Sequence, residues 1–150
     1  MRNTILVLIA VLSLNSCKKE KKATMQKNAM QNESFLTNGK HCFYSKIEDN
    51  NLILDATIKN DSITGNYDYI PKNGKPNKGI FVGTLEGNIA NTICEFTQND
   101  KKIKEELIFK LSKDKVSILG GEKEEKNGVW RFQNKNNGIY MNDIPRRNCN

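Results

Sequence analysis

The sequence predicts an all-β protein, a single antiparallel up-and-down barrel of eight or nine strands. From Cys42 onward, apolar and polar residues alternate with a period of two, as they do in half-buried strands. Turn residues interrupt this alternation about every twelve residues, and no helices alternate with the strands. Such short, hairpin-joined strands form a barrel or a sandwich, and glycines inside the strands fit the sharp coiling of a barrel.

The first half of the predicted barrel contains three strands and a long loop. Glu48-Asp49-Asn50-Asn51 and Lys59-Asn60-Asp61-Ser62 have the composition of turns. A polar loop from Pro71 to Lys78 follows, and it is the widest predicted connection. The three strands are predicted at residues 42–47, 52–58 and 63–69.

The second half begins with two strands joined at Gly87-Asn88, a tight turn. Residues 103–111 could form a helix on propensity alone, but their apolar side chains lie two apart, so a strand is predicted. The run from Glu122 to Glu125 is predicted to be a charged, solvated turn. The predicted strands of this half are 79–87, 89–98, 103–111, 116–119, 129–133 and 138–144.

The N-terminal sixteen residues have the pattern of a secretory signal. Arg2 supplies a positive charge, and Ile5 to Leu14 form an apolar run that is too short to cross a hydrocarbon core of about 30 Å. The stretch that ends at Cys17 resembles the lipobox of bacterial lipoproteins. That resemblance implies a diacylglyceryl thioether on Cys17, cleavage before it and acylation of the new amino terminus. A soluble secreted protein is the alternative, although no Ala-x-Ala-like site lies in reach.

Residues 17–38 have the composition of a flexible tether, and residues 39–150 are predicted to form the barrel domain. The formal charge of +7 divides into +1 from Arg2, +3 from the tether (five Lys minus two Glu) and +3 from the remainder (eighteen Lys and Arg minus fifteen Asp and Glu). The tether lysines would meet anionic headgroups. The barrel is only mildly basic and lacks a cationic stripe with aromatics, which argues against nucleic-acid binding.

Three cysteines remain once Cys17 is lipidated, which allows one disulfide and one free thiol. Bonding Cys42 to Cys149 would join the two ends of the domain, whereas Cys94 lies in a run that looks buried. We therefore expect the Cys42–Cys149 bridge, worth about 4 to 5 kcal/mol in the chain-entropy model. Metal binding is the rival use of these thiols, but His41 is the single histidine and no Cys-x-x-Cys pair occurs.

No constellation of catalytic residues is evident, so neither an enzyme nor a cofactor is expected. No Gly-x-Ser-x-Gly elbow occurs, and Glu105 and Glu106 point to opposite faces of their strand. Glu105 shares a face with apolar residues, so inside a barrel it would need a partner, either a structural ion pair or a ligand. The side chains that could line a ligand site at the barrel mouth are Tyr44, Tyr67, Tyr69, Glu105 and Trp130.

Several short motifs resemble a group of small bacterial lipoproteins of unknown function. They are Cys42-Phe43-Tyr44, the runs at 63–69, 77–83, 94–96 and 106–109, and the terminal Cys149. The resemblance spans most of residues 40–149 and implies a calycin-like barrel, similar to those of lipocalins and avidin. It also supports the pairing of the first and last cysteines of the domain.

The sequence therefore predicts a non-enzymatic lipoprotein of the bacterial cell envelope. Its membrane partner is lipid, through acylated Cys17, and it faces the periplasm or the cell surface. The expected ligand is a small apolar molecule or an envelope protein. The alternative is an inhibitor of a secreted enzyme, because small disulfide-closed barrels on lipid anchors resemble lysozyme-inhibitor lipoproteins. A barrel of charge +3 lacks an acidic face to steer a cationic lysozyme.

Overall fold

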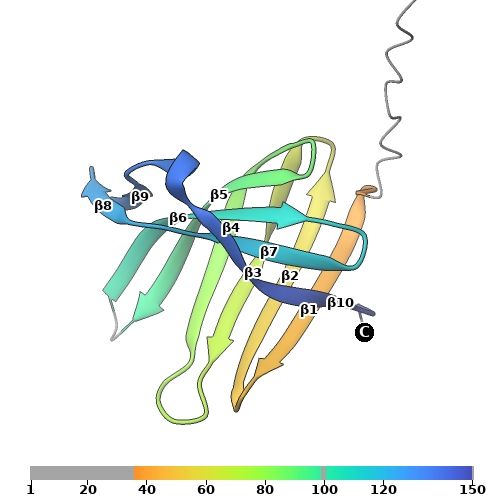
Figure 1. The fold of residues 1–150 in the computed structure, drawn as a ribbon, viewed down its shortest axis with the longest axis horizontal. Helices are drawn as coiled ribbons and strands as arrows, with labels where there is room; N and C mark the ends of the chain where they lie inside the picture. The colour runs from red at the N-terminus through yellow and green to blue at the C-terminus, as the bar shows by residue number, and fades with distance from the viewer. Residues whose placement is uncertain (1–35, 99–100, 150) are drawn as a thin grey trace, which may run out of the picture. The chain divides into compact units, whose positions relative to one another are not determined.

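Eight strands of the chain close into an antiparallel barrel, as the alternating pattern predicts (Figure 1). The structure is a computed structural model, and it describes residues 36–98 and 101–149. In this part of the chain no helix is long and apolar enough to cross a membrane. The elements are β1 (Gly39–Ile47), β2 (Asn50–Lys59), β3 (Ser62–Ile70), β4 (Asn77–Glu86), β5 (Ile89–Gln98), β6 (Lys101–Leu111), β7 (Lys115–Gly120), β8 (Lys123–Lys126), β9 (Val129–Phe132), a 3-10 turn η1 (Lys135–Asn137) and β10 (Ile139–Arg147).

The ring is formed by consecutive strands from β1 to β7, each paired with the next, and β10 pairs with both β7 and β1. Residues 103–111, which could have formed a helix on propensity, lie within strand β6, so the period-two prediction is confirmed. The predicted two-residue turn at Gly87-Asn88 is also present between β4 and β5.

The hairpin β8–β9 stands outside the ring. Its second strand, β9, lies within the strand predicted at 129–133, whereas β8 was not predicted. Lys123 to Lys126 form a strand that pairs with β9, so the prediction of a solvated turn over Glu122 to Glu125 was wrong. β9 in turn pairs in parallel with the first half of β6, which extends beyond β7. β8 is an exposed edge strand that is stabilised by pairing with β9, and it buries no apolar face. Its sequence therefore shows no alternation of apolar and polar residues.

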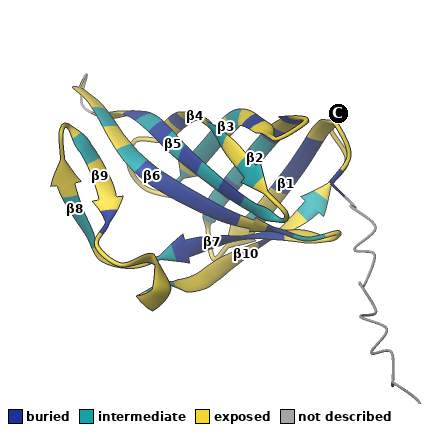
Figure 2. Cartoon of the chain, turned by 90° about the horizontal axis from the view of Figure 1, so that it is seen from above, coloured by how far each residue is buried: buried dark blue, intermediate teal, exposed yellow. Residues whose placement is uncertain are grey.

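Side chains fill the centre of the barrel. Phe43, Phe81 and Phe109 project inward from β1, β4 and β6 and are fully buried, and the rings of Phe81 and Phe109 meet edge to face with centroids 5.1 Å apart. Gly65 gives Phe81 its space, because a Cβ there would lie 2.7 Å from the ring. Figure 2 shows buried and exposed residues alternating along the ring strands. The other fully buried core residues among those described are Leu54, Ile63, Ala90, Cys94, Leu111, Val116 and Ile144.

The two ends of the barrel differ. One end, here called the tether end, holds the start of β1, the turn at Asn60-Asp61 and the end of β10. Leu36 is buried in the core at this end, and Asn38 accepts a hydrogen bond from the backbone N–H of Asn60 at 2.7 Å. The packed structure therefore begins before Gly39, the predicted start of the domain. The opposite end, the loop end, carries the β1–β2 turn, the loop at 71–76 and the β8–β9 hairpin.

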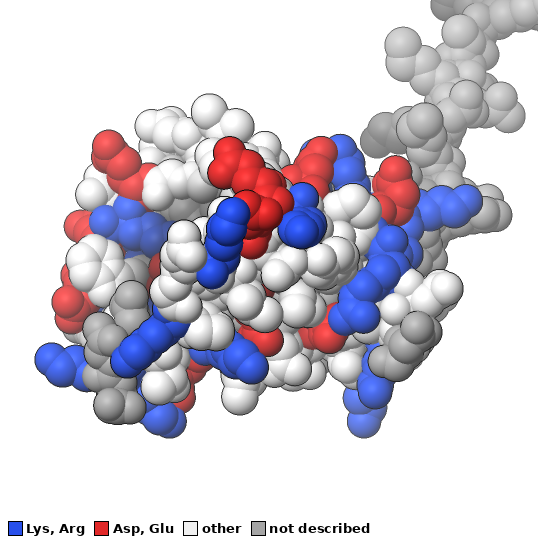
Figure 3. Space-filling view, turned by 90° about the horizontal axis from the view of Figure 1, so that it is seen from below, with Lys and Arg blue, Asp and Glu red and all other residues white. Residues whose placement is uncertain are grey.

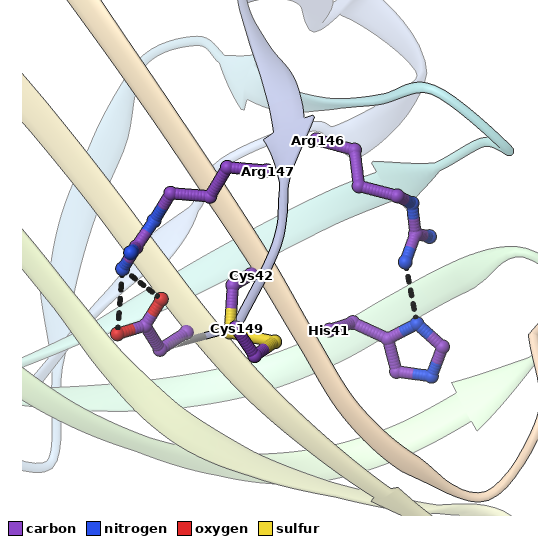
Figure 4. The surroundings of a disulfide bond; sticks show 6 residues. His41, Cys42, Arg146, Arg147 and Cys149 are labelled. Carbon is purple, nitrogen blue, oxygen red and sulfur yellow. Dashed lines mark hydrogen bonds and ion pairs between the residues drawn. A yellow bond between two sulfur atoms is a disulfide. The ribbon is translucent and has the colours of Figure 1, made fainter.

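A disulfide joins Cys42 to Cys149, as predicted (Figure 4). The two Cα atoms lie 5.3 Å apart, although 107 residues separate them in sequence. Between β1 and β10 only two residue pairs are in register, fewer than between any other two neighbours of the ring. Pro145, which precedes the two paired residues of β10, has no N–H to donate. The covalent bond thus reinforces the shortest seam of the barrel.

Candidate functional site

The predicted site residues do not all face the same space. Tyr67 and Tyr69 lie on inward-facing positions of β3 at the loop end, since their partners on β2 are the core residues Leu54 and Leu52. Tyr44 neighbours inward-facing Phe43 and therefore faces outward, where its hydroxyl donates to Asn51 Oδ1 at 2.8 Å. The barrel thus brings Tyr67 and Tyr69 together and separates Tyr44 from them.

Tyr67 forms the inner wall of the loop end. Its ring meets that of Phe96 edge to face across β4, with centroids 6.1 Å apart. Gly79 lies between them, and a Cβ there would lie 2.5 Å from Cys94 Sγ and 2.6 Å from the ring of Phe96. Burial, followed by the charge of Glu105, raises the pKa of Tyr67 to about 12. The phenol is therefore neutral and can act as a hydrogen-bond donor at physiological pH.

Glu105 also faces inward and has the partner that its position requires. Its carboxylate accepts from Lys123 Nζ at 3.0 Å, and both side chains are largely shielded from solvent. Lys123 comes from β8 and also lies 4.8 Å from the centroid of the Phe132 ring. Trp130 pairs with Glu105 across the β6–β9 ladder but lies outside the ring and is 43% exposed. The ion pair therefore ties the hairpin to the mouth of the barrel.

The Cys94 thiol is held in an unreactive state. Burial raises the pKa of the Cys94 thiol to about 12, with Glu105 adding to the effect and Lys123 opposing it. At neutral pH this free cysteine is a protonated core side chain rather than a nucleophile. Within residues 36–98 and 101–149, no group of three or more His, Cys, Asp or Glu side chains could hold a metal ion.

Three hollows lined by described residues open on the outside of the barrel. The first, of about 360 Å³, has a polar lining at the β7–β8 connection and η1. The second, of about 270 Å³, lies over the disulfide. The third, of about 240 Å³, has the most apolar surroundings and is called the β4–β9 groove. Its lining consists of Val82, Gly83, Thr84, Asn91, Thr92, Ile93, Glu106 and Arg131.

The β4–β9 groove lies beside two highly exposed aliphatic residues of β4. Ile80 is 71% exposed and Val82 is 61% exposed. Both flank inward-facing Phe81, so they point outward, and Ile93 pairs with Val82 on β5. None of these residues was among the predicted site residues. A signal was present, because three apolar residues in succession at 80–82 make this strand apolar on both faces.

The two charged residues of the groove differ in their hydrogen bonds and ion pairs. Glu106 is buried, and its carboxylate accepts from the backbone N–H of Phe132 at 3.1 Å and pairs with Lys135 Nζ at 2.7 Å. The guanidinium of Arg131 is exposed on β9 and makes no hydrogen bond or ion pair with any described residue, although Glu124 is its register partner on β8. The lining therefore presents one guanidinium without an ion-pair partner next to aliphatic side chains.

One face of the barrel carries both signs of charge. On the face seen in Figure 3, Lys and Arg side chains are interspersed with Asp and Glu. Ion pairs of the barrel include Lys102 with Glu95 at 2.7 Å and Arg147 with Asp55 at 2.9 Å. This face therefore presents no field of a single sign.

Comparison of the chain with protein-family models, with curated proteins and with solved structures finds no match. The candidate site must be judged from its own geometry. That geometry comprises a packed interior, a neutralised polar cluster at the loop end and an aliphatic groove with one free cation on the outer surface.

Proposed function

We propose that this protein is a lipid-anchored, protein-binding barrel of the bacterial cell envelope, without catalytic activity. The observation that carries the proposal is the contrast between the two faces of β4. Phe81 fills the interior together with Phe43 and Phe109, whereas Ile80 and Val82 on the same strand are left to solvent. Exposed aliphatic residues beside a groove are typical of interaction surfaces.

The packed centre favours protein binding over carriage of a small apolar ligand. A ligand site of ordinary size needs a hollow of roughly 300 Å³ or more, lined mainly by apolar groups. The inward-facing groups at the loop end are largely engaged, Glu105 with Lys123 and Tyr67 with Phe96. Inhibition of a cationic lysozyme is less favoured, because acidic and basic side chains are mixed on the face seen in Figure 3.

The proposed anchor lies outside the described residues. The lipobox-like stretch and Cys17 therefore remain sequence-based predictions. The first described residues bear on the geometry of attachment, since Leu36 is buried at the tether end and Asn38 bonds to Asn60 there. In a lipid-anchored protein the tether would thus join the barrel at the tether end. The outer walls and the loop end would remain free for a partner.

The anchor is tested by metabolic labelling with a palmitate analogue. The natural sequence is expected to incorporate the label and to partition into the detergent phase, whereas Cys17→Ser should do neither and should retain its leader. Cys94→Ser serves as the matched control, because it removes a different thiol and should leave labelling intact. Equal labelling of the Cys17→Ser protein would contradict the lipoprotein proposal.

The packed interior is tested by organic extraction of protein purified from its own membrane. Mass spectrometry of the extract should find no free apolar molecule in a stoichiometric amount relative to the protein. The acyl chains of the anchor should appear only after hydrolysis. Release of a small molecule in a stoichiometric amount would contradict the proposal of protein binding and would indicate that the barrel carries a small apolar ligand.

A further inference from the structure

We propose that the β4–β9 groove binds a short extended segment of a partner protein, in which an aliphatic side chain lies next to an acidic one. This inference rests on the proposed protein-binding function and names the surface and the chemistry of the partner. The aliphatic side chain lies against Val82 and Ile93, and the carboxylate pairs with Arg131.

The size of the groove suits a short segment rather than a globular face. Its β4 and β5 walls span three register pairs, Val82 with Ile93, Gly83 with Thr92 and Thr84 with Asn91. Three residues of a strand cover about 10 Å. A volume of about 240 Å³ accommodates a few side chains and no more.

Gly83 marks a close approach of β4 and β5 at the groove. A Cβ at this position would lie 2.0 Å from the carbonyl oxygen of Asn91 and 2.6 Å from Cα of Thr92, so no side chain fits there. The Cβ position of Gly83 shares the inner face with Phe81, so the outer wall of the groove on β4 is formed by Val82 and Thr84. Arg131 on β9 borders the groove on the other side of β5 and β6.

The aliphatic half of the recognition comes from Val82, Ile93 and the neighbouring Ile80. Val82 and Ile80 remain more than half exposed in the free barrel. Covering such side chains contributes about 25 cal/mol for each Å² of apolar surface removed from water. These residues therefore favour a partner that brings an aliphatic side chain of its own.

The charged half comes from Arg131. Both oxygens of Glu106, the one carboxylate in the lining, are engaged by Phe132 and Lys135. Arg131 is thus the charge that an incoming group can still neutralise, and a guanidinium matches a carboxylate with two parallel hydrogen bonds. Charge complementarity therefore selects an acidic side chain next to the aliphatic one.

The test uses blocked short peptides of alternating isoleucine and glutamate with the purified barrel. Calorimetric titration measures the binding of each peptide directly and needs no reporter group at the groove. Peptides with glutamine in place of glutamate, or serine in place of isoleucine, separate the two halves of the recognition.

Two variants test the named residues. Arg131→Gln should weaken binding of the glutamate peptide about fivefold and leave the glutamine peptide unaffected, as loss of a rim ion pair predicts. Val82→Thr keeps the shape of the exposed side chain and should weaken both peptides about tenfold. Lys46→Gln, which removes an exposed charge on β1, is the matched control and should leave binding unchanged.

Equal binding of the glutamate peptide to the natural barrel and to Arg131→Gln would overturn the assignment. So would tighter binding of laurate, a free aliphatic carboxylate, than of the peptide. If no peptide binds, while the barrel in cells contacts a protein through another face, the assignment of the groove is wrong and the proposal of protein binding still holds. If the barrel instead releases a stoichiometric apolar molecule on extraction, protein binding itself is wrong.

Discussion

The guanidinium of Arg146 donates a hydrogen bond from Nη1 to Nδ1 of His41 across 2.8 Å, joining the last strand to the first. Because a guanidinium only donates, His41 must accept at Nδ1 and can donate from Nε2, which lies 2.7 Å from the carbonyl oxygen of Thr37. Arg146 also donates to the backbone oxygens of Lys113 and Ser112. Its guanidinium lies 4.9 Å from the centroid of the Phe43 ring. Figure 4 shows His41 and Arg146 beside the disulfide.

Arg146→Met should destabilise the barrel by about 2 kcal/mol, because it keeps the apolar stem but leaves the buried His41 ring and two partly exposed carbonyl oxygens without their charged donor. Arg146→Lys should recover only part of the loss, since an ammonium cannot reproduce the planar set of donors. Urea unfolding measures both differences. A loss below about 1 kcal/mol for Arg146→Met would show that this cluster does not hold the tether end together.

The Cys42–Cys149 disulfide should contribute about 4 to 5 kcal/mol, because the bridge closes a loop that spans nearly the whole domain. Cys149→Ser should lower the urea midpoint by the corresponding amount. Cys94→Ala is the control, in which non-reducing peptide mapping should still recover Cys42 joined to Cys149. An unchanged midpoint for Cys149→Ser would contradict the stabilising role of the bridge at the β1–β10 seam.

Alkaline pH should destabilise the barrel through Tyr67 and Cys94. Burial raises the pKa of each to about 12, from ordinary values of 10.0 and 9.0. The unfolded chain therefore loses these protons first. The stability that the neutral groups supply is complete below their ordinary pKa values and disappears as pH rises toward 12. Tyr67→Phe keeps the contact with Phe96 and should show a shallower decline above pH 10. Identical pH profiles would refute this cause.

Phe132 should control the attachment of the β8–β9 hairpin. Its buried ring packs on Ile108 and Leu119, outward-facing residues of β6 and β7. Phe132→Ala should therefore free the hairpin while the barrel remains folded, so the amides of β8 and β9 should exchange faster than before and those of β2 to β5 should not. Arg131→Ala, the exposed neighbour, is the control. Uniformly faster exchange would instead indicate that the hairpin and barrel unfold together.

The ring of strands could be predicted because one face of each strand is buried and the other is largely polar. Leu52, Leu54, Ala56 and Ile58 show this alternation clearly, and all four are buried. The disulfide could be predicted because the two cysteines bracket the domain. Strand β8 could not, since Lys123 to Lys126 owe their conformation to pairing with β9 rather than to burial of an apolar face.

The candidate groove could be predicted only in part. The period-two alternation assigns Phe81 to the interior and therefore places its neighbours Ile80 and Val82 on the outside. Two aliphatic residues on the outer face of one strand could thus be recognised from the sequence. Arg131 could not be placed beside them, because β9 returns to β6 by a parallel pairing that no local pattern encodes. Tyr44, by contrast, was grouped with Tyr67 by residue type, although a neighbour of Phe43 must face outward.

The most direct test of protein binding by the outer face is photo-cross-linking in cells, with a photoreactive residue placed either at Val82 or at Tyr69. Val82 lies on the outer wall, whereas Tyr69 faces inward at the loop end. We predict a discrete protein adduct from position 82 and none from position 69, as judged by the mass of the product. A small-molecule adduct from position 69, with no protein adduct from position 82, would contradict the account.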